Sequence, residues 1–519
     1  MRLGIDVGGT NTDAVLVAGR TVLASAKRPT TDDVSSGIVN ATRAVLDAAA
    51  VSPSAIEGVM IGTTHFVNAL VERKGLLGVG VLRLAGAAGE ALPPMSGWPS
   101  DLKRCIGAIS FQLPGGYEFD GQENTAFNEN AVRNAALELR RKGLQSVAIS
   151  CVFAPINRSM EQRAAALVKE VAPEMSVTVS SALGRIGFLE RENATILNAA
   201  LSRMARHVMA SFTSAFAEIG IHAPLFVSQN DGTLISADYA AQYPVLTLGS
   251  GPTNSMRGAA FLTGIQDAIV MDVGGTTTDI GALVNGFPRE SSIAVNIGGV
   301  RTNFRMPDIL SIGLGGGTRI HLDADGQLLE IGPDSVGYLL SKEAYLFGGS
   351  TLTASDIAVK AGHANFGNAG RVPDLKPGVM DQILARFRTM LEDGIDRMKT
   401  AAADVPVVLV GGGSVLVPNE LKGASRVIRP EHASVANAVG AAISQVGAEV
   451  DRIVAYDNQD RATALQDVER EAAERAIAAG ADARTVRLVD VEETFLSYMP
   501  GNTVQIRAKV VGDLAVGAA

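Results

Sequence analysis

Apolar and polar residues along the first 84 positions follow a pattern that predicts short strands and then helices. The strands are short apolar runs separated by glycine-containing turns. The helices have apolar residues spaced three and four apart. The predicted strands of this part are 2–7, 13–17, 21–26, 58–61 and 79–84, and the predicted helices are 35–48 and 64–73.

Prolines and glycines interrupt the pattern from about 85 to 128, which predicts an irregular, loop-rich segment. Helices and strands then alternate regularly again, which predicts a mostly parallel sheet covered by helices, and hence the α/β class. The later elements are helices at 129–142, 159–171, 188–219, 380–400, 434–446 and 460–478, and strands at 146–153, 176–180, 226–229, 269–273, 405–410 and 504–510.

One strand-and-turn segment occurs twice. Asp6-Val7-Gly8-Gly9-Thr10-Asn11-Thr12-Asp13 is repeated as Asp272-Val273-Gly274-Gly275-Thr276-Thr277-Thr278-Asp279, each time after an apolar strand. Repeats at long spacing indicate duplicated structural units. Each copy predicts a strand that ends in a carboxylate, a two-glycine hairpin, and hydroxyl residues that begin a second strand.

The chemistry of this repeat favours phosphate binding. Glycines let backbone N–H groups approach phosphate oxygens, and the threonine hydroxyls add further donors. Asp6 and Asp272 suit Mg²⁺, a hard ion that binds through one or two carboxylates together with nucleotide phosphates. The alternative is a pair of ordinary Gly-Gly β-hairpins, which two near-identical copies make less favourable than one copy would.

A third glycine cluster, Gly411-Gly412-Gly413, follows the predicted strand at 405–410. In a nucleotide site it would lie under the adenosine, although a plain strand-to-helix turn explains it equally well. The sequence contains no GxxxxGK[ST] motif, and Gly313 to Gly317 does not sit between a strand and a helix. Neither a P-loop nor a dinucleotide-binding fold is therefore supported.

Composition narrows the function further. Glycine accounts for 56 of 519 residues, above the typical fraction of about 7%. The net charge of −9 argues against sequence-independent nucleic-acid binding, and no apolar run is long enough to span a membrane. The two cysteines have no metal-binding spacing, which together with the sequence start predicts a reduced, cytoplasmic protein without disulfides.

Taken together, these motifs resemble the actin/hexokinase/heat-shock ATPase superfamily and, within it, the hydantoinase A/5-oxoprolinase family. The segments similar to the family, besides the glycine motifs above, are Gly62-Thr63-Thr64 with Asn68-Ala69-Leu70 and Glu72-Arg73-Lys74-Gly75, Glu190-Arg191 with Thr195 and Asn198-Ala199, Ser250-Gly251-Pro252, Ser311 to Gly317, Leu352-Thr353 with Asp356, and Tyr498-Met499-Pro500-Gly501.

This resemblance implies two actin-like (ribonuclease H-like) lobes with mixed sheets flanked by helices, an inserted α/β region and a small C-terminal α/β unit. The expected segments are a first lobe at 1–84, the insertion at 85–185, the rest of the first lobe with the second lobe at 186–450, and the C-terminal unit at 451–519. The family implies ATP-dependent opening of a cyclic amide or imide, such as a hydantoin or 5-oxoproline. Related members activate ketones for carboxylation in the same way.

The implied cofactors are ATP and Mg²⁺, and the implied partners are a small cyclic amide and a second, hydantoinase B-like subunit. A homo-oligomer is left open. The nucleotide-binding residues are then Gly8, Gly9, Thr10, Asn11 and Thr12, Gly274, Gly275, Thr276, Thr277 and Thr278, and Gly411 to Gly413, with Asp6 and Asp272 as metal-binding and catalytic carboxylates.

Thr63, Thr64 and His65 are further catalytic candidates, because they follow a strand and begin a helix that would face the nucleotide site. The alternative is a helix N-cap with a structural histidine. His321, Asp323 and Asp325 suggest a metal or substrate loop, but a hairpin at 323–326 is favoured. Glu190-Arg191-Glu192 is expected on a solvated helix face.

Two other function classes remain open. A small-molecule kinase of the same superfamily would release a phosphorylated product, although the zinc-binding cysteines common in ROK kinases are absent. An actin-like filament, chaperone or reactivating ATPase would turn over ATP without a response to cyclic amides.

Overall fold

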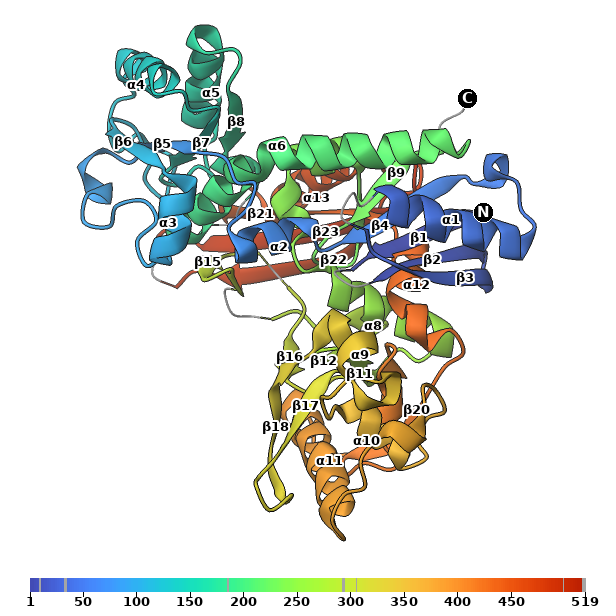
Figure 1. Cartoon of the computed structure of the whole chain (residues 1–519). Helices are drawn as coiled ribbons and strands as arrows, with labels where there is room; N and C mark the ends of the chain where they lie inside the picture. Colours follow the sequence, from blue (N-terminus) through green and yellow to red (C-terminus); the bar gives the residue numbers. More distant parts are fainter. Residues whose placement is uncertain are drawn as a thin grey trace. The chain divides into compact units, whose positions relative to one another are not determined.

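The computed structural model describes residues 1–8, 11–31, 35–183, 186–291, 295–304, 306–497 and 499–515. These residues form two compact units. The first unit contains Met1–Gly62, Ser250–Ser291 and Pro307–Ser444, and the second contains Thr63–Gly249, Ser292–Met306 and Gln445–Ala519. Strands and helices alternate through both units, which confirms the predicted α/β class (Figure 1).

The first unit begins with the predicted β-meander. Its strands run in the order β4-β1-β2-β3, and apolar residues of β1 and β2 are fully buried. Helix α1 packs on β2 and β3, while α12 packs on β1 and β2. The bounds are β1 Arg2–Val7, β2 Asn11–Ala18, β3 Thr21–Pro29, β4 Gly58–Thr63, α1 Ser35–Ala49 and α12 Ala436–Ile443.

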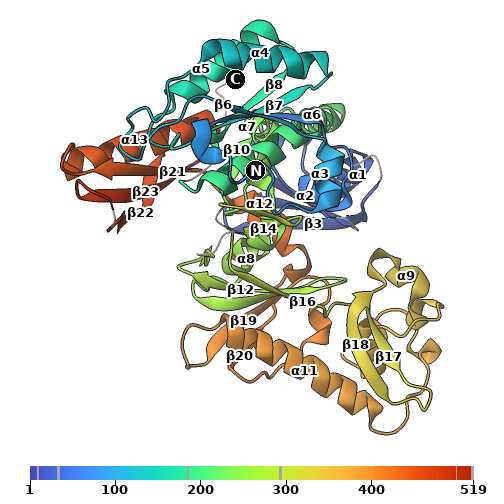
Figure 2. The ribbon, with the colours of Figure 1, turned by 90° about the vertical axis from the view of Figure 1, so that its left-hand side faces the viewer.

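A second sheet in the same unit has the order β13-β12-β11-β19-β20, with β16 also paired to β12. Helix α11 packs against β12 and β16 of this sheet through Ile383, Phe387 and Leu391 (Figure 2). The bounds are β11 Ala268–Val273, β12 Thr278–Val284, β13 Phe287–Pro288, β16 Ile309–Ile312, β19 Val405–Val410, β20 Ala424–Ile428, α8 Ser250–Thr263 and α11 Val379–Met398.

The repeated motif forms two hairpins with the same register. Asp6 pairs with Asp13 across β1 and β2, and Asp272 pairs with Asp279 across β11 and β12. The Gly274 N–H donates to the Thr277 carbonyl at 2.9 Å, as the Gly8 N–H donates to that of Asn11 at 3.0 Å. The duplication predicted from sequence is therefore a duplication of strand pairing and of the hydrogen bond at the end of each strand pair.

Helices α8 and α12 meet at glycines. A Cβ atom on Gly258 would lie 2.0 Å from the Ala436 carbonyl oxygen, and one on Gly440 would lie 1.9 Å from that of Asn254. Both distances are shorter than any van der Waals contact, so no larger residue fits at either position. The two helices, one associated with each sheet, consequently approach each other backbone to backbone.

Smaller elements complete the first unit. The β17–β18 hairpin turns at 323–327, where the Asp323 carboxylate accepts hydrogen bonds from the N–H groups of Asp325 and Gln327. The hairpin predicted at 323–326 is therefore confirmed. The bounds are β17 Thr318–Leu322, β18 Leu328–Ser335, α9 Leu340–Glu343 and α10 Ala354–Lys360.

The second unit contains a four-stranded parallel sheet of order β6-β5-β7-β8. The expectation of an irregular segment at 85–128 is partly wrong, because α3 and β6 form there. Leu102 and Ile106 bury one face of α3, and prolines on both sides had obscured this short pattern. The bounds are α2 His65–Glu72, β5 Val79–Leu84, α3 Ser100–Ile106, β6 Ile109–Leu113, α4 Glu129–Arg141, β7 Ser146–Cys151, α5 Ser159–Val171 and β8 Ser176–Val179.

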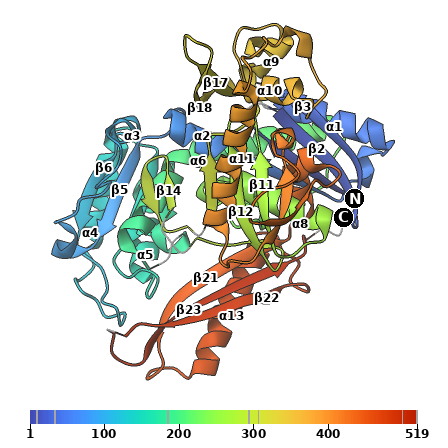
Figure 3. The same cartoon turned by 90° about the horizontal axis from the view of Figure 1, so that it is seen from below.

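The remaining strands of this unit follow the order β22-β23-β21-β10-β9, and α13 packs on β21 and β23 (Figure 3). The helix predicted at 460–478 and the strand predicted at 504–510 are confirmed in the tail, as α13 and β23. The bounds are α6 Phe188–Glu218, β9 Leu225–Ser228, β10 Leu234–Ser236, α7 Ala237–Gln242, β14 Val295–Ile297, β15 Val300–Thr302, β21 Val446–Ala455, α13 Arg461–Ala478, β22 Arg487–Phe495 and β23 Thr503–Gly512.

The start of α6 differs from expectation, because Arg191 and Glu192 are buried rather than solvated. Glu192 accepts hydrogen bonds from the Arg83 guanidinium and from the Ser150 hydroxyl. A buried ion pair of this kind is satisfied by partners on other strands, which a helical pattern does not reveal. Among the described residues, no helix is long and apolar enough to cross a membrane.

Candidate functional site

A cavity of about 360 Å³ lies in the first unit, where the two repeated hairpins and the third glycine cluster come together. We call it the hairpin cavity. Its lining residues are Asn11, Asp13, Lys27, Asp272, Gly274, Gly275, Thr277, Asp279, Gly316, Leu340, Ser355, Phe366, Gly411, Gly412, Gly413, Val415, Ser434 and Asn437.

Most of the predicted nucleotide-binding residues that the structure describes therefore lie around one cavity. Gly9 and Thr10 fall outside the described residues. The predicted site residues Asp6, Gly8 and Thr276 do not line it. Thr12 and Thr278 are buried and do not line it either: the Thr12 hydroxyl pairs with that of Thr30, and the Thr278 hydroxyl donates to the Leu314 carbonyl. These two threonines therefore stabilise the hairpins without facing the cavity.

Asp6 and Asp272 are joined by a short hydrogen-bond network. The Asn437 Nδ2 group donates to Asp6 Oδ2 at 3.3 Å. The Ser255 hydroxyl contacts both Asp272 Oδ2 and Asn437 Oδ1, and its single hydrogen is donated to one of them at a time. Ser255 belongs to α8 and Asn437 to α12, so the glycine contacts between these helices position the network.

The carboxylates of the first hairpin are buried and those of the second are half-buried, and this raises their pKa values. Burial, followed by repulsion from Asp13, raises the pKa of Asp6 to about 7. Burial also raises the pKa of Asp272 to about 6, with repulsion from Asp279 adding to the effect. A cation between these groups would stabilise their ionised forms.

The arrangement fits a divalent cation bound together with phosphates. Asp6 Oδ1 is buried without a hydrogen-bond partner in the described part of the chain. The described residues contain no cluster of three His, Cys, Asp or Glu side chains that could hold a metal alone. Mg²⁺ commonly takes only one or two protein carboxylates and completes its shell with water and phosphate oxygens. Asp6 and Asp272 are the residues that would hold it.

The third glycine cluster packs directly on the second hairpin. A Cβ atom on Gly411, whose φ is +83°, would lie 2.4 Å from Asp272 Oδ1, and the Gly413 N–H donates to the Val273 carbonyl at 2.8 Å. A Cβ atom on Gly412 would meet nothing within 4 Å. The backbone at Gly412 is thus open to the cavity, as close approach of a ligand requires.

The glycines at 315–317 also support the second hairpin. The Gly316 N–H donates to the Gly274 carbonyl at 3.0 Å, and the Gly317 N–H donates to that of Gly275 at 2.7 Å. A Cβ atom on Gly315 would lie 2.6 Å from the Thr276 carbonyl carbon. This cluster therefore holds the turn in place by backbone contact, a role that the sequence left unassigned.

Lys27 is a site residue that the sequence analysis missed. It lies opposite Asp13 in the β2–β3 register, and its Nζ atom is 2.6 Å from Asp13 Oδ2 at the cavity wall. In the second hairpin Asp279 instead accepts a hydrogen bond from the Ser311 hydroxyl. The one signal in the sequence was the alternation along β3, which places Lys27 on the same face as Ser25.

Thr63, Thr64 and His65 lie together at the start of α2 in the second unit. The Thr63 hydroxyl is 3.0 Å from His65 Nδ1 and accepts a hydrogen bond from the His65 N–H. Thr64 is the N-cap residue of α2, and its hydroxyl accepts from Asn68 Nδ2 at 3.3 Å. Burial lowers the pKa of His65 below its ordinary value, which favours the neutral ring at pH 7.

Comparisons with known proteins agree with this architecture. Residues 2–172 match the family model "Hydantoinase/oxoprolinase N-terminal region", and residues 191–367 match "Hydantoinase/oxoprolinase". The caprolactamase subunit alpha of Pseudomonas jessenii is 29% identical over 427 residues, which cover 76% of this chain and 60% of that protein.

The acetophenone carboxylase gamma subunit of Aromatoleum aromaticum is 27% identical over 433 residues, covering 77% of this chain and 58% of that protein. The chain thus spans about 60% of the length of these relatives. The crystal structure of the ATP-dependent caprolactamase from Pseudomonas jessenii matches 99% of this chain and 87% of that one, with a TM-score of 0.79 at 21% identity, which shows a shared fold. By its two family matches, the chain belongs to the hydantoinase/oxoprolinase family.

Proposed function

We propose that the chain binds ATP with Mg²⁺ in the hairpin cavity and uses it to phosphorylate the carbonyl oxygen of a cyclic amide or imide. Hydantoins, 5-oxoproline and related lactams are the proposed substrate class, and the outcome is ATP-dependent hydrolysis. The observation that carries the proposal is the hydrogen-bond network that links Asp6 and Asp272, one from each repeated hairpin; Asp272 lines the hairpin cavity together with glycines of the second hairpin and of the third cluster.

Each part of the cavity would have a distinct task. The backbone N–H groups of the two Gly-Gly turns would bind phosphate oxygens, since small turns of this kind present several donors at once. Asp6 and Asp272 would hold Mg²⁺, which when bound neutralises charge on the phosphates. Lys27 would add a second positive charge at the wall, with Asp13 fixing its position.

Phosphorylation of the carbonyl oxygen makes the amide carbon reactive toward water. An amide carbon is a poor electrophile because its nitrogen donates electron density to the carbonyl. Transfer of the γ-phosphoryl group to the amide oxygen breaks a P–O bond of ATP and releases ADP. Water can then add to the carbon, and the ring C–N bond breaks as the nitrogen takes up a proton, which leaves an acyl phosphate. A second water adds to the same carbon, and phosphate leaves with the former amide oxygen to give the carboxylate. Protein residues contribute mainly by positioning and charge stabilisation.

Thr63, Thr64 and His65 are proposed to act on the substrate side. A neutral His65 ring, held by the Thr63 hydroxyl, could accept a proton from an attacking water. A second subunit is proposed because the relatives named above are a subunit alpha and a gamma subunit.

Carbonyl activation for carboxylation is a second candidate, favoured by the similarity to the acetophenone carboxylase gamma subunit. In this reaction ATP would phosphorylate the enolate oxygen of a ketone, which activates the ketone for carboxylation. The two functions differ in the stimulating substrate and in the need for bicarbonate.

The deciding experiment measures ADP release with hydantoins, lactams, 5-oxoproline and ketones, with and without the candidate partner subunit and bicarbonate. Stimulation by a cyclic amide without bicarbonate supports the hydrolase. Stimulation by ketones with bicarbonate supports the carboxylase. Accumulation of a stable phosphorylated product would indicate a kinase, and ADP release insensitive to every substrate would indicate a reactivating ATPase.

A further inference from the structure

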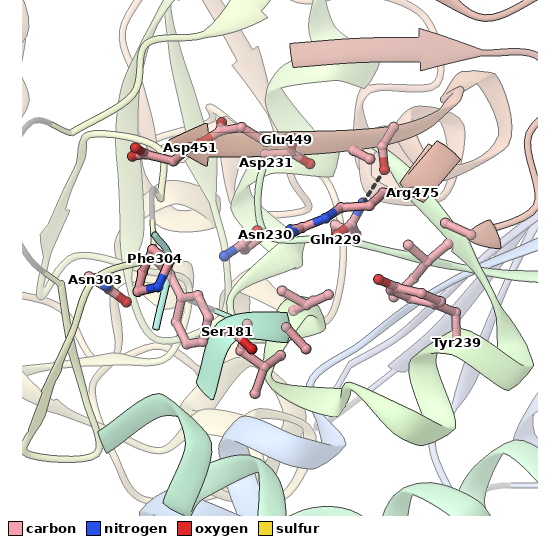
Figure 4. Close-up of a pocket in the computed structure, with 18 of the residues that line it drawn as sticks. Ser181, Gln229, Asn230, Asp231, Tyr239, Asn303, Phe304, Glu449, Asp451 and Arg475 are labelled. Carbon is pink, nitrogen blue, oxygen red and sulfur yellow. Dashed lines mark hydrogen bonds between the residues drawn. The ribbon is translucent and has the colours of Figure 1, made fainter. Parts of the chain in front are cut away.

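A second cavity, of about 120 Å³, lies within the second unit. Figure 4 shows its walls, which come from the β9–β10 turn, the segment around Ser181, residues 303 and 304, strand β21 and helix α13. No residue that lines it also lines the hairpin cavity. Its volume is smaller than that of the hairpin cavity, so it suits a small ligand.

Asn303 is an unsatisfied side chain on this cavity. Both its Oδ1 and its Nδ2 atoms are buried, and neither has a hydrogen-bond partner among the residues that the structure describes. Burying an amide without partners costs free energy of folding, so such groups are uncommon unless a ligand or water completes them. An amide in a ligand would satisfy both atoms, because it presents one acceptor and one donor side by side.

Arg475 and Arg158 provide positive charge at the same cavity. Arg475 extends from α13 toward Gln229 and Asn230 (Figure 4). Glu471 Oε1 lies 2.9 Å from Arg475 and 2.5 Å from Arg158, and its Oε2 lies 2.6 Å from Arg452. Three guanidinium groups thus share one carboxylate, which leaves donors and positive charge for a further anion. A guanidinium suits a carboxylate because its N–H groups match both oxygens.

The acidic residues of the cavity are engaged with partners of their own. Asp231 pairs with Lys509 at 2.9 Å, and Glu449 pairs with Arg507 at 3.0 Å. Asp451 accepts two hydrogen bonds from Gln505 Nε2. These carboxylates are therefore held on the β21 side of the cavity. The apolar part of the lining comprises Leu183, Ile235, Tyr239, Leu246 and Phe304.

We propose that this cavity binds a small carboxylic acid that also carries an amide group. Its carboxylate contacts Arg475 and Arg158, its amide pairs with Asn303, and its short carbon skeleton packs on Phe304 and Tyr239. The site takes its ligand independently of nucleotide, because all its residues belong to the second unit. Amino acids acylated on nitrogen belong to this chemical class.

The test is isothermal titration calorimetry on the full chain without nucleotide. N-acetylglycine carries both groups, N-methylacetamide lacks the carboxylate, and propionate lacks the amide. We expect N-acetylglycine to bind at least about tenfold more tightly than either of the others. Asn303→Ala and Arg475→Gln should each weaken N-acetylglycine binding by about tenfold or more, whereas Arg470→Gln on the exposed face of the same helix should not.

Loss of binding in Asn303→Ala cannot be attributed to unfolding. The substitution removes no side-chain hydrogen bond that the structure describes in the free protein, so the melting temperature should stay unchanged or rise. ATP binding in the first unit should be unaltered in this variant, which separates this proposal from the nucleotide proposal. Equal binding of the three compounds, binding of inorganic phosphate but of no carboxylate, or full N-acetylglycine affinity in Asn303→Ala would each overturn it.

Discussion

Asn437 donates a hydrogen bond from Nδ2 to Asp6 Oδ2 at 3.3 Å, while its amide oxygen contacts the Ser255 hydroxyl that also reaches Asp272. One asparagine on α12 therefore connects the carboxylates of both repeats. The geometry of the proposed metal and phosphate site depends on a residue that belongs to neither repeat.

Replacing this asparagine should weaken nucleotide binding. Asn437→Leu removes the donor to Asp6 Oδ2, so that carboxylate is no longer held in position, and we expect ATP with Mg²⁺ to bind about tenfold more weakly. Titration calorimetry with ATP and Mg²⁺ measures the effect. Asn40→Ala, on the exposed side of α1 in the same unit, is the matched control. An unchanged Kd in Asn437→Leu would show that the network does not position the site.

Substitutions of two adjacent glycines, Gly411 and Gly412, should differ in their effect on stability. Gly411→Ala forces a Cβ atom to 2.4 Å from Asp272 Oδ1 at a φ of +83°, and should lower the free energy of unfolding by about 2 kcal/mol or more. Gly412→Ala meets no protein atom within 4 Å and should change stability by less than about 0.5 kcal/mol. Urea unfolding measures both.

Gly412→Ala also tests where the nucleotide binds. If the phosphates or ribose approach the Gly412 backbone, Gly412→Ala should weaken ATP binding severalfold despite its normal stability. Wild-type ATP affinity in this variant would mean that the nucleotide lies elsewhere.

Lys27→Met should mainly affect turnover. Removing a positive charge that faces a transferred phosphoryl group lowers the rate by about 100-fold in comparable electrostatic sites, while ground-state affinity changes less. Steady-state ADP release gives kcat and KM separately. Arg28→Gln changes the exposed neighbouring cation on β3 and should behave like the wild type. A rise in KM alone would assign Lys27 to binding rather than to the transition state.

His65 should make the protein sensitive to mild acid. Its folded pKa is lowered by burial, so the unfolded chain binds the proton more readily between that value and about 6.5. Stability from this residue is therefore complete above pH 6.5 and falls as the pH decreases. His65→Gln should lose less stability between pH 7.5 and 5.5 than the wild type, as followed by thermal unfolding. An identical loss in both proteins would place the acid sensitivity in other groups.

The close approach of the α8 and α12 backbones can be tested by its effect on stability. Gly440→Ala would bring a Cβ atom to 1.9 Å from the Asn254 carbonyl oxygen, and we expect a loss of about 3 kcal/mol or more. Gly251→Ala, in the first turn of α8 with nothing within 4 Å, should be neutral. Chemical unfolding compares the two, and similar stabilities would contradict the close backbone approach.

Local patterns were sufficient for much of this fold. The predicted bounds of β5, α5 and β19 agree with the structure, because each has a clear period and is bounded by turn residues. The duplicated hairpins could be predicted because glycine turns and carboxylates recur at fixed spacing. These features are encoded within about ten consecutive residues.

The rest depends on contacts between distant segments. Ser255, Asn437 and Lys27 come from α8, α12 and β3, and no local pattern distinguishes them from other polar residues. Likewise, β21 pairs in parallel with β10 more than 200 residues earlier, so the sheet that the tail joins could not be predicted. The buried Arg83–Glu192 pair was missed for the same reason.

The glycine contacts between α8 and α12 have a consequence for how this site tolerates sequence change. Side chains can adopt new rotamers when a core residue is replaced, but two backbones already in contact have no such freedom. Substitutions elsewhere in either sheet will therefore alter the stability of the first unit before they alter the separation of Asp6 and Asp272. The distance between the two carboxylates is set by main-chain geometry, so it can stay the same while the surrounding sequence changes.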